Sequence, residues 1–119
     1  MSRGLGKVQA RTLALLREKG ELDPLELAGI VYGVEPDAAG IVRVNDAQCA
    51  AVRRALTTLQ QRGLAFRTGF NTLGRSCWRD RAAAVEYVDR VAQAFGNSAL
   101  RDYPRPLQEA WADSRTEGP

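Results

Sequence analysis

The chain has 119 residues and a net charge of +3, with 45% hydrophobic and 26% charged residues, as expected of one soluble domain with or without an appendage. Its apolar runs are too short for a membrane span, and the N-terminal MSRGLGKVQAR lacks the apolar core of a signal peptide, which favours the cytoplasm. With no histidine and only two cysteines, a zinc site and a disulfide framework are both excluded as explanations of the fold.

The first predicted helix covers about residues 5–19. Leu5, Val8, Thr12, Leu15 and Leu16 recur at helical spacing and give it one buried face. The glycine that follows is typical of a helix end, and the next two residues are expected to be extended.

The second predicted helix begins at Asp23-Pro24-Leu25-Glu26. Asp23 can accept a hydrogen bond from a free amide of the first turn, Pro24 suits the first helical position, and Glu26 can complete a capping box. The helix ends at Gly33. Its apolar residues do not form one stripe, which predicts burial on more than one side.

A long connection, residues 34–44, leads to the third predicted helix at 46–62, capped by Asn45 and closed by Gly63. Residues 41–44 of this connection are expected to be extended or a short strand. The buried stripe of the third helix is predicted to contain Cys49, Val52, Ala55, Leu56 and Leu59.

Two strand-like runs, residues 64–70 and 75–79, are separated by Asn71-Thr72-Leu73-Gly74, which predicts a β-hairpin. Phe66 and Trp78 are expected to be core residues under the hairpin, whereas Cys77, on the other face of its strand from Trp78, is expected to be partly exposed.

A fourth helix is predicted at about 80–95, with apolar residues at i, i+3, i+4 and i+7. This stripe either packs back on its own domain or forms a homodimer interface through residues 81–95. Residues 98–119 are interpreted as a partly disordered tail, in which one helical turn could bring Leu107 and Trp111 together and the residues from Asp113 onward are disordered.

These elements predict a mainly α fold with a small β-hairpin, an α+β protein. Their order resembles the winged helix-turn-helix superfamily of DNA-binding proteins. The resemblance covers about residues 4–79 and is based on DPLELAGIVYG, on NDAQCAAVRRALTTLQQRGL and on the hairpin directly after it. The phrase AVRRALTTLQQRGLAFR is similar to bacterial and phage regulators.

The resemblance implies a winged helix-turn-helix domain at 1–80 with an additional C-terminal helix at 81–97. It also implies that helix 46–62 is the recognition helix and that hairpin 64–79 is the wing. The 11-residue connection departs from the tight turn that is usual in the family, so it affects how the third helix would enter a groove.

The charge is unevenly distributed. Residues 42–81 hold eight arginines and two acidic residues, a net of +6, while the rest of the chain has a net of −3. Such a segment favours binding of a polyanionic partner. The alternative is that the basic face is merely solvated and binds no partner.

We predict contacts with double-stranded DNA from the third helix and the hairpin. On the helix, Arg54 is the candidate for a bidentate guanine contact and Arg53 contacts DNA toward the flank. Ala47 and Ala50 would permit close approach or touch thymine methyls, and Thr57, Thr58 and Arg43 would contact phosphates. From the hairpin, we predict contacts with the minor groove or the sugar-phosphate backbone by Arg67, Asn71, Thr72 and Arg75. The start of the first helix, with Arg3, Lys7 and Arg11, could add phosphate contacts.

The sequence offers no histidine, nucleophile motif or glycine-rich phosphate loop, so we expect no enzyme activity, no cofactor and no metal. The alternative to a transcription regulator is a winged-helix module that binds proteins without binding DNA, suggested by the apolar fourth helix and Trp111. Structured RNA is a third partner that the same basic surface permits.

Overall fold

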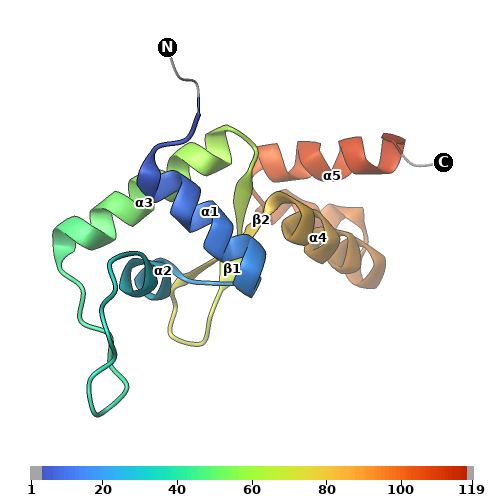
Figure 1. Ribbon diagram of the computed structural model, residues 1–119. Helices are drawn as coiled ribbons and strands as arrows, with labels where there is room; N and C mark the ends of the chain where they lie inside the picture. The colour runs from blue at the N-terminus through green and yellow to red at the C-terminus, as the bar shows by residue number, and fades with distance from the viewer. Residues whose placement is uncertain (1–3, 118–119) are drawn as a thin grey trace.

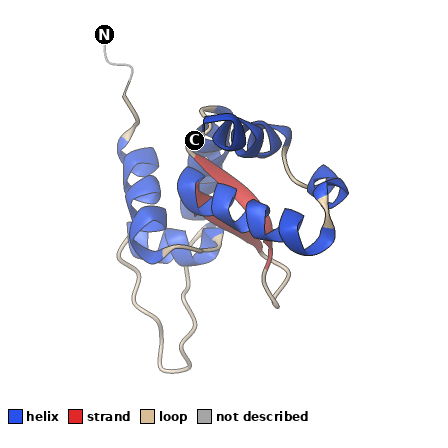
Figure 2. Cartoon of the chain, turned by 90° about the vertical axis from the view of Figure 1, so that its right-hand side faces the viewer, coloured by secondary structure: helices blue, strands red, loops and turns tan. Residues whose placement is uncertain are grey.

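Two antiparallel strands lie at the centre of the chain, with helices on both faces (Figures 1 and 2). A computed structural model describes residues 4–117. Its elements in chain order are α1 (Lys7–Lys19), α2 (Pro24–Val31), α3 (Asp46–Gln61), β1 (Ala65–Phe70), β2 (Ser76–Asp80), α4 (Arg81–Phe95), the 3-10 helix η1 (Asn97–Asp102) and α5 (Arg105–Glu117). The mainly helical fold with a two-stranded hairpin is confirmed.

Side chains fix where α2 and α3 begin, as their sequences predict. Asp23 accepts a hydrogen bond from the Glu26 amide at 2.8 Å, and Glu26 accepts one from the Asp23 amide at 2.9 Å. Asn45 and Gln48 make the same reciprocal pair at the start of α3, at 2.8 and 3.0 Å. These two capping boxes satisfy amides that have no partner within the helix.

The hairpin separates two apolar clusters. One, which contains Trp78, lies between the hairpin and α1, α2 and α3, and the other, which contains Phe66, lies under α4, η1 and α5. Phe66 pairs with Arg79 in the register and Arg67 pairs with Trp78, so Phe66 and Trp78 lie on opposite faces of the hairpin. Both are buried, as predicted, but they stabilise different cores.

Leu22 extends the hairpin on one side. Its amide donates to the Trp78 carbonyl at 3.1 Å, and the Trp78 amide donates to the Leu22 carbonyl at 2.9 Å. The extended segment expected after α1 is therefore present, and it ties the α1–α2 connection to β2.

The C-terminal region differs most from expectation. η1 and α5 replace the tail, and the prediction of disorder from Asp113 is wrong as far as Glu117; residues 118–119 lie outside the described residues. The reason is that Leu107, Ala110 and Trp111 form an apolar stripe that is buried against α4. The Pro104 carbonyl accepts from the Leu107 amide at 3.0 Å, so the proline-rich segment starts a helix.

The apolar stripe of α4 is covered within the chain. Ala84, Val88 and Ala92 are buried against η1 and α5, while Phe95, at the helix end, is 76% exposed. Of the two predicted roles for this stripe, the structure therefore has the one in which it packs on its own domain. The apolar residues that a homodimer interface through residues 81–95 would use are already buried.

The two cysteines also differ from their predicted environments. Cys77 is 5% exposed, so the expectation of partial exposure is wrong; the Glu21 side chain lies against it. Cys49, predicted to be buried on α3, is only half-buried, since it lies at the edge of the stripe. Burial and the nearby Glu21 carboxylate raise the pKa of the Cys77 thiol to about 11.

The long connection between α2 and α3 contains no strand but has an ordered turn. The Asp37 carboxylate accepts from the amides of Ala39 at 2.9 Å and Ile41 at 3.0 Å. The Ile41 amide, with smaller contributions from Ala39 and Arg43, keeps the pKa of Asp37 below its usual value. Gly29 lets this connection pack closely on α2, because a Cβ there would lie 2.6 Å from the Val42 side chain.

Candidate nucleic-acid interface

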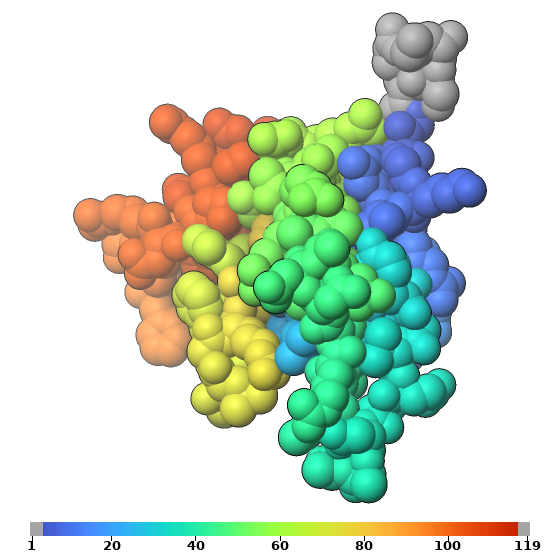
Figure 3. Space-filling model, turned by 90° about the vertical axis from the view of Figure 1, so that its left-hand side faces the viewer, coloured from blue at the N-terminus to red at the C-terminus, as the bar shows by residue number. Residues whose placement is uncertain are grey.

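The outer face of α3 is exposed along its length. Val52, Leu56 and Leu59 pack into the apolar cluster that contains Trp78, and the opposite side of the helix is open to solvent (Figure 3). The turn of the hairpin lies along one flank of α3 and the start of α1 lies along the other. The elements therefore present α3 as a ridge between two flanking segments.

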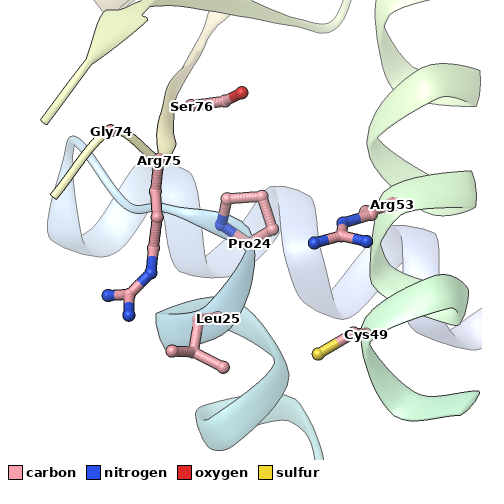
Figure 4. A pocket seen from close by; sticks show the side chains of 7 residues that line it. All are labelled: Pro24, Leu25, Cys49, Arg53, Gly74, Arg75 and Ser76. Atoms are coloured by element: carbon pink, nitrogen blue, oxygen red, sulfur yellow. The ribbon is translucent and has the colours of Figure 1, made fainter. Parts of the chain in front are cut away.

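Arg53 and Arg54 leave α3 toward opposite flanks. Arg53 lines a cleft of about 290 Å³ between α2, α3 and the hairpin, and Figure 4 shows its side chain extending toward Pro24, with Arg75 on the other side of the proline. Arg54 lines the groove between α3 and α1, together with Lys7. Neither Arg53 nor Arg54 forms an ion pair within residues 4–117.

The smaller predicted contact residues of α3 share its outer face but differ in availability. Ala47 and Thr57 are exposed, and Ala50 and Thr58 are half-buried. The Thr57 hydroxyl donates to the Arg53 carbonyl at 3.0 Å, so its oxygen remains free to accept a further hydrogen bond. Ala47 and Ala50 add little bulk to this face of the helix.

The hairpin turn is organised by Asn71. Its side-chain oxygen accepts from the amides of Leu73 at 2.9 Å and Arg75 at 3.0 Å, and its side-chain nitrogen donates to Asp23 at 2.9 Å. Asp23 therefore caps α2 and also anchors the turn, with the Arg75 guanidinium 3.8 Å away. Asn71 and Asp23 thereby hold exposed Arg75 beside the flank of α3, and Thr72 is also exposed in the turn.

Besides Arg75, other arginines of the basic segment also bind within the chain. Arg79, with a side chain only 17% exposed, pairs with Glu21 at 3.0 Å, donates to the Thr68 hydroxyl and lies 4.0 Å from the centre of the Tyr87 ring. Arg81 donates to the Gly63 carbonyl at 3.2 Å. The charge count of the sequence therefore overstates the charge that is free to meet a partner.

Arg43, predicted to contact phosphate, also binds within the chain. It pairs with Asp37 at 3.1 Å in the connection before α3. Its side chain is 75% exposed, so it can still reach solvent, but the carboxylate offsets its charge. Arg3, suggested as a phosphate contact, lies outside the described residues.

Sequence reasoning missed the two apolar side chains at the tip of the hairpin. Phe70 is 66% exposed and Leu73 is 70% exposed, beside Arg67 and Arg75. Regular alternation along β1 would put Phe70 on the face of Phe66, but Thr68 is inserted as a β-bulge between Arg67 and Gly69 and reverses the alternation after it. No local signal in the sequence marks the bulge.

Comparisons with family models, with curated proteins and with solved structures give no match. Among residues 4–117, no helix has the length and apolar character needed to cross a bilayer. The same residues contain no group of three or more cysteine or acidic side chains that could hold a metal ion.

Proposed function

We propose that this protein binds double-stranded DNA as a winged helix-turn-helix protein and regulates transcription. In this proposal α3 enters the major groove and the hairpin, residues 64–79, acts as the wing. The observation that carries it is that Arg53 and Arg54 project from the open face of α3 without an acidic partner in the described chain.

The dimensions of α3 suit this role. A helix with its side chains is about 10–12 Å across, and the major groove of B-DNA is about 12 Å wide. Ala47 and Ala50 allow close approach to base edges, and Arg54 has the length and donor geometry for the O6 and N7 atoms of guanine. Thr57 and Thr58 lie on the same face, where hydroxyls can hold phosphates.

The hairpin adds contacts on the flank of α3. Arg75 shares the cleft with Arg53, and Arg67 and Thr72 are exposed elsewhere on the hairpin. Asn71 contributes mainly by holding the turn, because its polar atoms are hydrogen-bonded to the turn and to Asp23. We therefore assign phosphate contacts to the arginines and a positioning role to Asn71.

The alternative of a protein-interaction module was suggested by the apolar fourth helix and by Trp111, and neither is available to a partner. Trp111 is buried at 9% exposure and donates to Asp89 at 3.0 Å, and the apolar stripe of α4 is covered by α5. RNA is disfavoured as a partner because the major groove of an A-form helix is too deep and narrow to admit side chains from α3.

Fluorescence anisotropy with a labelled random duplex and with a duplex from upstream of the protein's own gene tests the proposal. We expect both to bind at low salt and the upstream duplex to bind more tightly, with affinity falling by about 0.9 log units per neutralised phosphate for each tenfold rise in salt. A double-stranded RNA competitor should displace neither duplex as well as unlabelled DNA does. The absence of binding at low salt would contradict the proposal.

A further inference from the structure

The tip of the hairpin combines exposed apolar side chains with rigid support. Phe70 and Leu73 are among the most exposed large hydrophobic residues of the described chain. The segment that carries them is not loose, because Asn71 accepts from the amides of Leu73 and Arg75 and donates to Asp23. Leu73 is therefore held away from the core at a defined position.

The bulge at Thr68 gives the tip its composition. Without the extra residue, Arg67 and Phe70 would lie on opposite faces of β1, because they are three positions apart. With it, the guanidinium carbon of Arg67 lies 5.6 Å from the centre of the Phe70 ring. The Arg67 amide also donates to the Gln60 side chain, near the end of α3, at 3.2 Å, and Arg67 and Phe70 line one pocket together with Asp102 and Tyr103.

The tip therefore presents apolar groups between two cations. Arg67 stands beside Phe70 on one strand, and Arg75 follows Leu73 and Gly74 on the other. Gly74, with φ of +78°, allows the tight turn that brings Arg75 next to the tip. Acidic side chains offset part of this charge: the buried Asp23 carboxylate lies 3.8 Å from the Arg75 guanidinium, and exposed Asp102 lines the same pocket as Arg67.

On the basis of the function proposed above, we propose that Leu73 inserts as an apolar wedge into the minor groove beside the site of α3. Arg67 and Arg75 hold the phosphates on either side, and Phe70 widens the apolar contact. An apolar side chain inserted between base pairs partly unstacks them and bends the duplex toward the major groove. The wedge favours pyrimidine–purine steps, which unstack at the lowest cost, and so gives specificity without a hydrogen bond to a base.

A duplex suits this surface better than a protein partner. Two side chains and a turn are far smaller than the roughly 1,200 Å² that a stable protein interface buries. The flanking arginines can neutralise phosphates at the edges of a groove while staying partly hydrated, whereas they would have to be desolvated and paired in a protein interface.

The test uses duplexes of about 25 base pairs that the wild-type protein selects from a random pool, with a donor and an acceptor dye at the two ends. We expect wild-type protein to raise the energy transfer between the ends and to bind duplexes with a central TA step more tightly than duplexes with an AA step. Leu73→Ser should remove both effects and weaken binding about tenfold.

Two matched variants isolate the wedge. Phe95→Ser removes an equally exposed apolar side chain from the end of α4, away from the hairpin, and should leave affinity and bending unchanged. Arg75→Ala should lower the slope of log affinity against log salt by about 0.9, a change that Leu73→Ser should not produce because leucine carries no charge.

The outcomes separate the wedge from DNA binding as such. Salt-dependent binding with unchanged affinity and bending in Leu73→Ser would overturn the wedge and leave the proposed function intact. If wild-type protein selects no duplex from the pool, both proposals fail. Equal losses in Leu73→Ser and Phe95→Ser would also overturn the wedge, because the effect would then be general to exposed apolar residues.

Discussion

The two sides of the hairpin use the same residue type in opposite ways. On the α4–α5 side, Arg79 lies against Tyr87 and pairs with Glu21, and Arg115 pairs with Asp89 at 3.2 Å beside Trp111. On the α3 side, Arg53 and Arg54 have no acidic partner among the described residues. The first set stabilises the fold, and the second is available for a polyanion, so the surroundings of an arginine are more informative than the number of arginines.

The largest loss of stability should come from a substitution in the apolar cluster between the hairpin and α4–α5. Phe66→Ala deletes a fully buried side chain under α4 and α5 and is expected to lower the free energy of unfolding by about 3–5 kcal/mol. Urea denaturation followed by circular dichroism measures this change. A loss below about 1 kcal/mol would mean that the second cluster is not a stabilising core.

Substitutions on the exposed face of α3 should change DNA binding and leave stability unchanged. Arg54→Ala is expected to reduce discrimination between the preferred and a random duplex by about 1–3 kcal/mol, because it removes the candidate guanine contact. Its unfolding midpoint should match that of wild type. If affinity and specificity were both unchanged, α3 would not be the recognition helix.

A smaller loss of stability is expected from Arg79. Arg79→Ala removes an ion pair, a hydrogen bond and a ring contact, together worth about 1–2 kcal/mol of unfolding free energy. Because Arg79 faces α4, the salt dependence of DNA binding should keep its wild-type slope in conditions where the variant is folded. A reduced slope would show that Arg79 reaches the DNA.

The last prediction concerns reactivity and involves no change in stability. With a pKa of about 11, the Cys77 thiol has about one thiolate in a thousand at pH 8, and it is also buried. We expect one thiol per folded chain, Cys49, to react with a thiol reagent at pH 8, and Cys77 to react only after unfolding or as the pH approaches 11. Mass spectrometry of the labelled peptides distinguishes the two residues.

The sequence predicted the features that depend on neighbouring residues. The capping box of Asp23 and Glu26, the cap at Asn45 and the buried stripe of α3 follow from spacings of three or four positions, and all are present except that Cys49 of the stripe is only half-buried. The same reasoning placed the exposed predicted contacts of α3 on one face. Local chemistry decides these features, so tertiary packing does not override them.

Features that depend on distant residues were not predictable in this way. The hydrogen bond between Asn71 and Asp23 joins residues 48 positions apart, and the bulge at Thr68 changes which side chains share a face. The partners of Arg79 and the helix in place of a C-terminal tail both follow from how α4 and α5 pack on the hairpin. A single sequence read by periodicity does not contain those pairings.

The difference between the two sides can be measured in one experiment that compares charge-matched double variants. Arg53→Ala/Arg54→Ala removes two cations from the open face of α3, and Arg90→Ala/Arg101→Ala removes two exposed cations from α4 and η1. We predict that the first pair lowers the slope of log affinity for duplex DNA against log salt by about 1.8 and that the second pair leaves it unchanged. Equal slopes in the two variants would contradict the assignment of α3 as the DNA-binding face.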